Sequence, residues 1–299
     1  MAGRIACVAP SRLKTGTHPY YGINVGAESL RATSGGSMSM FGWLATKFCS
    51  FPRFDGKEEA FGFLFQRAPY DSAVSFYGVR MINNISDRTF RFAMVGSYGR
   101  FISDWIKRQD CPFCFIDIGA NQGLYSLLAA LNPFCERVVS FEPVPGTFSY
   151  LVRNIVENGL EDRIVPICAA IAPGSNRLAT FSVPTGHSGA ASSFDHGDSK
   201  VPVLTIDART IAEVLAEGPD ARLLCKIDVE GSEKAVLQIL QDAHVLQRID
   251  ALVIEVSDRT GAGGQSKELL QFMDDLSWVM KSRDGSWSHY DALFTRGQG

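Results

Sequence analysis

The sequence lacks the features that mark a membrane protein, a secreted protein or a general nucleic-acid binder. No apolar run reaches the length of a membrane span, and no hydrophobic signal segment precedes Pro10. The formal net charge is only −3, so we expect no broad basic surface for nucleic acid. The seven cysteines are odd in number and come without a secretory signal, which predicts reduced thiols and a cytoplasmic location.

The sequence also lacks a recognisable metal or dithiol motif. Cys111 and Cys114 have the spacing of a redox pair, but they precede an apolar strand segment, whereas a thioredoxin-type pair follows a strand and opens a helix. A zinc site needs four ligands, and no second close Cys or His pair supplies them. We interpret the pair as two small residues at the entrance of a strand, and no metal is predicted.

Three regions differ in composition. Residues 1–40 carry Gly, Ser and Thr clusters without sustained periodicity, which predicts a flexible extension. Residues 41–95 are rich in aromatic residues, chiefly Phe, and are predicted to be an accessory segment packed against the main domain. A membrane-surface or partner-binding role is the alternative, which the sparse basic face disfavours. Residues 96–299 are predicted to form the main domain.

Apolar runs of strand length alternate with helical patterns through the main domain. We predict core strands beginning at Phe115 and over 137–142, 164–169, 223–228, 251–255 and 290–295, and shorter strands over 178–183 and 201–206. We predict helices over 97–107, 146–158, 232–241 and 269–280. This alternation predicts an α/β fold with a doubly wound, mostly parallel sheet covered on both faces.

Four of the five predicted core parallel strands end in or next to a carboxylate. These residues are Asp117, Glu142, Asp228 and Glu255. Parallel strands end at one edge of the sheet, where such folds bind their ligands. An acid at one strand end is unremarkable, but acids at four ends on one edge predict a cleft.

The turn after the first core strand narrows the choice of ligand. A dinucleotide fingerprint has three glycines, but here Asn121 stands in place of the second glycine and Leu124 in place of the third. The second glycine lets the backbone approach a pyrophosphate. We therefore predict an adenosine ligand without a pyrophosphate, with its ribose on Glu142. S-adenosylmethionine fits, because its sulfonium charge favours nearby carboxylates such as Asp117.

Four motifs in order resemble the FkbM-type S-adenosylmethionine-dependent methyltransferases. They are FIDIGANQGLYS (residues 115–126), SFEPVP (residues 140–145), RNIVENG (residues 153–159) and KIDVEGSE (residues 226–233). The resemblance covers roughly residues 96–295. It implies a class I methyltransferase (Rossmann-like) fold, with a seven-stranded sheet whose last strand is antiparallel. It also implies O-methylation of a sugar hydroxyl, in a glycolipid or exopolysaccharide, or of a secondary-metabolite hydroxyl.

The resemblance also implies roles for individual residues. The methionine part of the cofactor would bind Asp117, Gly119, Asn121 and Gly123. Glu142 would accept hydrogen bonds from the ribose, and Ala169 would line the adenine pocket. Asp228 and Glu230 would lie beside the transferable methyl group. The Gly/Ser loop that contains His187 corresponds to a family segment near the cofactor.

The hydroxyl nucleophile needs a base, and two residues are candidates. Asp228 lies where the fourth motif meets the substrate, and His187 has an unperturbed pKa near neutrality. Each has a structural alternative, because Asp228 could cap the helix that begins near Ser232 and His187 could be a solvated loop residue. Glu230 could serve the turn alone. Asp228 and Glu255 could bind a divalent cation, although their spacing is not a recognisable ligand motif.

Three functions compete at this point. The main hypothesis is an S-adenosylmethionine-dependent O-methyltransferase with a carbohydrate or small-molecule hydroxyl acceptor. A non-catalytic module that binds the same cofactor is the second, and the intact motif residues count against it. A nicotinamide-dependent oxidoreductase is the third, and Asn121 and Leu124 disfavour it.

Overall fold

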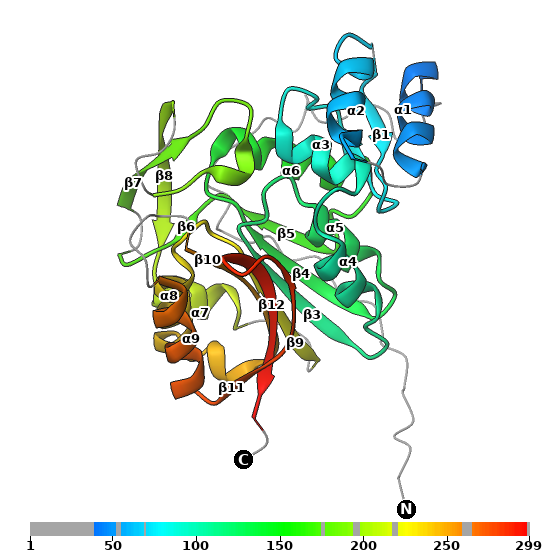
Figure 1. The fold of residues 1–299 in the computed structure, drawn as a ribbon. Coiled ribbons are helices and arrows are strands. Elements are labelled where there is room, and N and C mark those ends of the chain that lie inside the picture. Colours follow the sequence, from blue (N-terminus) through cyan, green and yellow to red (C-terminus); the bar gives the residue numbers. More distant parts are fainter. Residues whose placement is uncertain are drawn as a thin grey trace, which may run out of the picture. The chain divides into compact units, whose positions relative to one another are not determined.

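The centre of the fold is a seven-stranded sheet in the order β11-β12-β10-β9-β3-β4-β5 (Figure 1). The fold is taken from a computed structural model, which describes residues 39–51, 55–68, 70–174, 177–193, 198–216, 221–258 and 265–297. The strands are β3 (Phe113–Ile118), β4 (Cys135–Phe141), β5 (Ile164–Ile167), β9 (Arg222–Ile227), β10 (Ile249–Ser257), β11 (Trp278–Gly285) and β12 (His289–Arg296). Only the last strand in the chain, β12, runs antiparallel to its neighbours, so the predicted sheet is confirmed.

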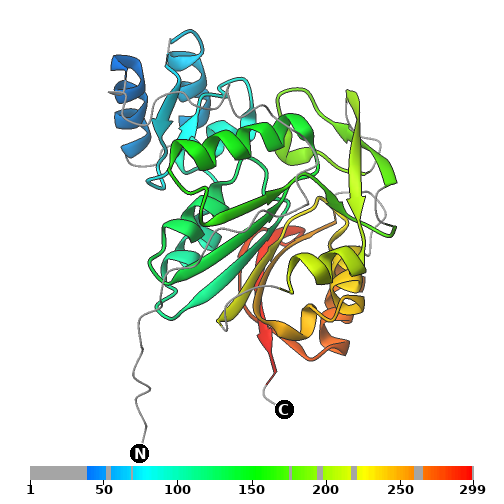
Figure 2. The ribbon, with the colours of Figure 1, turned by 180° about the vertical axis from the view of Figure 1, so that it is seen from behind.

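Helices cover both faces of this sheet, as the views in Figures 1 and 2 show. One layer consists of α4 (Arg100–Lys107), α5 (Leu124–Leu131) and α6 (Pro145–Glu157), and the other of α7 (Ala208–Val214), α8 (Glu233–Asp242) and α9 (Gln265–Asp275). Successive strand residues point to opposite faces. Phe115 and Leu224 therefore join the first core, whereas Ile116 and Cys225 join the second. Both faces are buried, which explains why the strands read as continuous apolar runs.

The accessory segment packs onto the first core through its aromatic residues. It forms α1 (Met40–Ser50), α2 (Lys57–Phe65), β1 (Ser72–Val74), β2 (Arg80–Ile82) and α3 (Arg88–Val95). Phe48, Phe61, Phe65 and Tyr70 stack against one another in this part. The predicted extension, residues 1–40, lies outside the described residues except for Ser39 and Met40.

A second, three-stranded sheet follows β5 in the chain. It has the order β6-β8-β7, with β6 (Ala170–Ile171), β7 (Arg177–Val183) and β8 (Ser199–Ile206). The two short strands predicted over 178–183 and 201–206 are confirmed by β7 and β8. No helix in the described part of the chain combines the length and apolarity needed to cross a membrane.

The predicted helix over 269–280 is wrong at its C-terminal end. Helix α9 ends at Asp275, and Ser277 adopts a left-handed backbone conformation with φ 60°. Few non-glycine residues adopt this conformation, and it stops a helix. Trp278 is then buried as the first residue of β11, which pairs with β12. The apolar residues 278–280 fit the helical spacing, but they belong to the edge strand β11, which the sequence pattern does not predict.

Asn154 on α6 joins the accessory segment to the turn after β3. Its side chain is fully buried, its Oδ1 accepts a hydrogen bond from Ile82 N (2.7 Å) and its Nδ2 donates to Gln122 O (2.8 Å). Both bonds satisfy backbone groups, which are costly to leave unpaired in the interior. The asparagine of the RNIVENG motif (residues 153–159) therefore has a structural role, which local sequence does not reveal.

Asn154→Ala is expected to destabilise the protein by about 2–4 kcal/mol, because a buried N–H and a buried C=O lose their partners. Asn158 is a matched control on the same helix, since it makes the same kind of contacts with Arg80 but is only half-buried. Asn158→Ala is expected to cost about 1 kcal/mol. Urea unfolding followed by circular dichroism measures both, and equal losses would contradict a special role for Asn154.

Candidate functional site

The carboxyl ends of the parallel strands open into a cavity of about 870 Å³. The chain runs outward from β3 through β4 and β5 in one direction, and returns to β9 and β10 on the other side. The cavity lies at this switch point, where open α/β sheets bind ligands. Among the predicted site residues, those that line the cavity are Gly119, Asn121, Glu142, Ala169, His187, Asp228 and Glu230. Asp117 and Gly123 do not line it.

The turn after β3 passes directly over the end of β9. A Cβ atom on Gly119 would lie 1.9 Å from the carbonyl oxygen of Asp228, so no other residue fits there. Gly123 has φ 92° and is the N-cap of α5, and a Cβ atom on it would clash with Leu151 at 2.5 Å. The two glycines therefore act differently, because Gly119 allows a close approach at the cavity whereas Gly123 allows helix packing.

Glu142 lies at the cavity wall immediately after β4 and is almost fully buried. Its Oε2 accepts a hydrogen bond from Asn121 N and its Oε1 accepts one from Val144 N, both at 2.9 Å. Burial raises the pKa of Glu142 to about 7, although these two backbone bonds act to lower it. Each carboxylate oxygen has a further lone pair for a ligand hydroxyl.

A buried ammonium group lies between two of the strand-end acids. Lys226 Nζ is 3.4 Å from Asp117 Oδ1 and 3.5 Å from Asp228 Oδ2, and it donates to Gly119 O at 2.6 Å. Burial alone would lower the pKa of Lys226, but Asp228 and Asp117 raise it above its usual range. Asp117 is completely buried and also accepts a hydrogen bond from Ser126 Oγ (2.6 Å). Asp117, which does not line the cavity, thus holds Lys226, which does.

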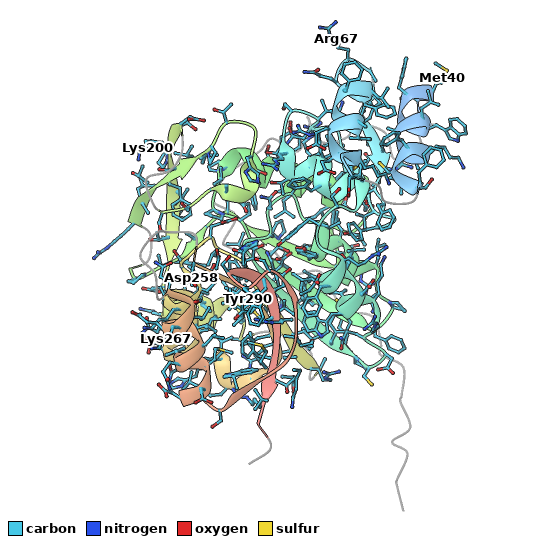
Figure 3. The ribbon with its side chains drawn as sticks, in the orientation of Figure 1. Met40, Arg67, Lys200, Asp258, Lys267 and Tyr290 are labelled. Carbon is cyan, nitrogen blue, oxygen red and sulfur yellow. The ribbon has the colours of Figure 1, made fainter. Side chains whose placement is uncertain are left out.

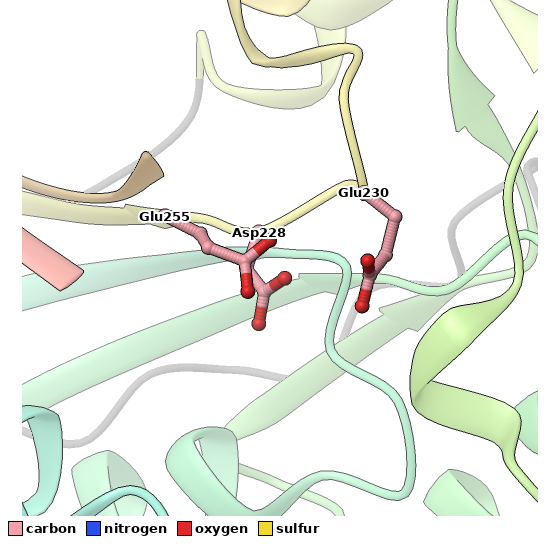
Figure 4. Close-up of side chains that lie close together, drawn as sticks. All are labelled: Asp228, Glu230 and Glu255. Carbon is pink, nitrogen blue, oxygen red and sulfur yellow. The ribbon is translucent and has the colours of Figure 1, made fainter. Parts of the chain in front are cut away.

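Further acids gather around Asp228. Its carboxylate and those of Glu230 and Glu255 lie with one oxygen each within 4.8 Å of the others (Figure 4). Asp291 on β12 pairs in register with Glu255. Burial and the charge of Asp228 raise the pKa of Asp291 to about 7, and burial with neighbouring acids raises the pKa of Glu255 well above its usual range. Tyr290, labelled in Figure 3, lines the cavity beside Asp291.

The segment that contains His187 closes one side of the cavity. It continues into η1 (Ser188–Ala190), and Ser188 N and Ser188 Oγ both donate to the carboxylate of Asp87, at 2.7 and 3.1 Å. Ser188 Oγ also lies 3.1 Å from Asn121 Oδ1, and Gln122 Nε2 donates to Asp87 at 3.1 Å. Asp87 therefore fixes this segment against the turn after β3. His187 is half-buried on the cavity wall.

Several of these residues were not predicted from the sequence. Asp87 is the N-cap of α3, and the sequence could indicate this role because Asp is favoured at that position. Its hydrogen bonds to Ser188, 101 residues away, cannot be predicted from local sequence. Asp291 is an acid within an apolar strand, which is a signal for a buried functional group. His289, whose Nε2 lies 3.3 Å from Glu255 Oε1, gave no signal.

Solved structures with a similar arrangement are distant. TrmK of M. capricolum, solved with S-adenosyl-homocysteine, is 13% identical with a TM-score of 0.43, and the match covers 67% of this chain and 70% of that chain. A putative tRNA (m1A22) methyltransferase of Streptococcus pneumoniae is 12% identical with a TM-score of 0.42, covering 68% and 72%. Likeness at this level carries no argument about function.

The sequence relatives are methyltransferases. The 31-O-demethyl-FK506 methyltransferase FkbM of Streptomyces tacrolimicus is 30% identical over 181 residues, which cover 52% of this chain and 69% of the relative. Methyltransferase 1 of Beauveria bassiana is 27% identical over 175 residues, with the same coverages. Methyltransferase sdnD of Sordaria araneosa is 24% identical over 224 residues, covering 62% and 85%.

The family model of the methyltransferase FkbM domain matches residues 117–280, which is more than half of the chain. The matched region begins within β3 and includes Glu142, Asp228 and Glu255. This assignment decides against the nicotinamide oxidoreductase and the non-catalytic module. The protein is an S-adenosyl-L-methionine-dependent methyltransferase with a class I fold, and the chain belongs to the FkbM family.

Proposed function

We propose that the protein is a cytoplasmic O-methyltransferase that transfers the methyl group to a hydroxyl of a sugar or a secondary metabolite. The acid-lined cavity at the end of β9 supports this proposal most strongly, because carboxylates beside the methyl group favour proton loss from a hydroxyl. The name of the Streptomyces tacrolimicus relative describes methylation at an oxygen, which agrees with this proposal. The six described cysteines are free thiols, as expected in a reducing compartment.

The cofactor is proposed to lie across the turn after β3. Gly119 and Asn121 would contact its methionine part directly, and Glu142 would accept hydrogen bonds from the ribose. Ala169, a buried residue at the cavity wall, would contact the adenine. Asp117 and Gly123 would not contact the cofactor directly. Asp117 would position Lys226, and Gly123 would position the start of α5. The sulfonium would then face Asp228 and Glu230, whose negative charges stabilise it.

The reaction needs alignment more than covalent chemistry. The acceptor oxygen attacks the methyl carbon, the carbon–sulfur bond breaks and its electron pair stays on sulfur. S-adenosylhomocysteine and the methyl ether are the products, and the hydroxyl proton passes to a base. Holding oxygen, carbon and sulfur in line supplies a large part of the rate enhancement. Asp228 and His187, both on the cavity wall, are the proposed bases.

The accessory segment, residues 41–95, and the main domain, residues 96–299, are proposed to build the acceptor pocket together. Thr89, Phe92 and Arg88 on α3 line the same cavity as the strand-end acids. The acceptor would therefore bind between α3 and the carboxyl ends of the strands. The boundary at residue 96 stays a prediction.

S-adenosylhomocysteine is expected to bind about tenfold more tightly at pH 8 than at pH 6, because ionised Glu142 accepts the ribose hydrogen bonds and its pKa of about 7 leaves it mostly protonated at pH 6. The Glu142→Gln variant is expected to bind weakly and without this pH dependence. Isothermal titration calorimetry across this range measures both.

Asp291 provides the control for the pH experiment, since its pKa is also about 7 but it lies on β12, away from the proposed ribose site. Asp291→Asn should keep the pH dependence of the wild type. If Glu142→Gln retains the full dependence, the ribose assignment to Glu142 is wrong.

Asp228→Asn is expected to lower kcat by at least about 100-fold, the usual effect of losing a group that assists proton transfer. Its affinity for S-adenosylhomocysteine should change little, since the variant keeps the backbone that meets Gly119. His187→Ala is the comparison, because it leaves every carboxylate in place. Steady-state kinetics on the identified acceptor separate the two, and a larger loss in His187→Ala would move the base assignment there.

Cell extract supplied with radiolabelled S-adenosylmethionine and the enzyme tests the acceptor class. The label is expected in the polysaccharide, glycolipid or small-molecule fraction, and it should resist mild alkali because methyl ethers are stable where methyl esters release methanol. Heat-inactivated enzyme is the control. Label confined to protein or nucleic acid, or released by alkali, would contradict the proposed function.

A further inference from the structure

The strand-end acids of β9 and β10 converge more closely than a cofactor site requires. Asp228 and Glu230 follow β9, and Glu255 lies on β10. One carboxylate oxygen from each lies within 4.8 Å of the others, and all three residues line the cavity. Figure 4 shows the three side chains directed into one common space, with Glu230 on the opposite side of it from Glu255.

Glu255 supplies a second observation, independent of this proximity. Its side chain is only 3% exposed. Its Oε1 lies 3.3 Å from His289 Nε2, but among the residues that the structure describes its Oε2 has no hydrogen-bond partner. A buried carboxylate oxygen is normally paired, and an unpaired one on a residue that lines a cavity indicates a missing ligand atom.

Two basic groups lie beside the cluster. Lys226 lines the same cavity, its Nζ lies 3.5 Å from Asp228 Oδ2, and it is also engaged by Asp117 and by the carbonyl oxygen of Gly119. His289 Nε2 lies 3.3 Å from Glu255 Oε1. Asp291, which pairs in register with Glu255, adds a further acid beside the cluster.

We propose that Asp228, Glu230 and Glu255 form a binding site for one hard divalent cation, such as Mg²⁺ or Mn²⁺. Carboxylate oxygens are the ligands that these ions prefer, and one oxygen from each of the three carboxylates lies within 4.8 Å of the others. His289 would orient the Glu255 ligand from its other oxygen, as outer partners of metal ligands commonly do.

The sulfonium of the cofactor does not substitute for this cation. Its charge lies behind three carbon substituents, so carboxylates remain at van der Waals distance and cannot enclose it from three sides. One of those substituents, the methyl group, must also face the acceptor. A metal ion, in contrast, contacts all three carboxylates directly and leaves coordination positions toward the cavity.

This inference rests on the proposed function and extends it. A cation held by the cluster would offer its open positions to the hydroxyl oxygen of the acceptor, polarise the O–H bond and fix the oxygen near the methyl group. The acceptor would then be a molecule with a metal-accessible hydroxyl oxygen. The loss of activity expected for Asp228→Asn would include loss of the cation.

Electron paramagnetic resonance with Mn²⁺ tests the site on the full-length chain, freed of metal by dialysis against a chelator. The wild type is expected to bind one Mn²⁺ per chain, and Mg²⁺ should displace it. Glu255→Gln, Asp228→Asn and Glu230→Gln are each expected to weaken binding at least about tenfold, the scale known for perturbed metal sites. Circular dichroism confirms that each variant is folded, and Glu230, half-buried in a turn, is the variant least able to disturb the core.

Asp284→Asn is the matched control, because Asp284 lines the same cavity but lies outside the cluster. It should leave Mn²⁺ affinity unchanged. Absence of stoichiometric Mn²⁺ binding by the wild type, or an equal loss in Asp284→Asn, would overturn the proposal.

Calorimetry with S-adenosylhomocysteine on the same metal-free samples separates the cation-site proposal from the proposed function. Cofactor binding without Mn²⁺ binding would remove the cation site and leave the proposed function intact, whereas failure to bind the cofactor would count against the proposed function itself.

Discussion

The buried ion pair network around Lys226 is the constraint on which the rest of the site depends. A side chain only 2% exposed carries an ammonium group at the junction of β3 and β9, the two strands that separate the halves of the sheet. Removing one partner of such a network leaves a buried charge unpaired, which typically costs about 3–5 kcal/mol. Because Lys226 also donates to Gly119 O, it ties the turn after β3 to the end of β9. The positions of the cofactor turn and of Asp228 are therefore fixed relative to each other.

The excess of acids around this network explains the electrostatic character of the cavity. Glu142, Asp291 and Glu255 are all buried and all have a raised pKa, so the protein pays a desolvation cost to keep carboxylates there. Apolar residues of similar size would be more stable in those positions. A cluster of perturbed carboxylates in a cavity is characteristic of a functional site rather than of a structural core. Positive charge arriving with a ligand offsets the cost, which favours cationic ligands in this cleft.

Much of the fold followed from the sequence because local patterns determine it. The strand–turn–helix around Gly119 and the acids at strand ends are readable residue by residue, and the topology follows from the alternation of strands and helices. The sequence does not predict which face of the sheet each strand side chain points to. Both faces of β3 and β9 are apolar, so these strands show no alternation of apolar and polar residues. For the same reason the sequence could not tell that Asp117 lies behind the cavity wall whereas Asp228 lines it. The edge strand β11 was missed because only its first residue, Trp278, is deeply buried.

The wall opposite the acids could not be predicted, because it depends on contacts between residues far apart in the chain. The carboxylate of Asp87 accepts hydrogen bonds from Phe90 N, Gln122 Nε2 and Ser188, and so joins α3, the cofactor turn and η1 at one point. The family match begins at residue 117, so Asp87 and all of α3 lie outside it. His289 and Asp291 on β12 lie beyond its other end. The proposed cofactor side of the cavity is thus built from family residues, whereas much of the proposed acceptor side is built from segments that flank them. The residues of α3 and β12 that line the cavity therefore lie outside both the family match and the Lys226 network.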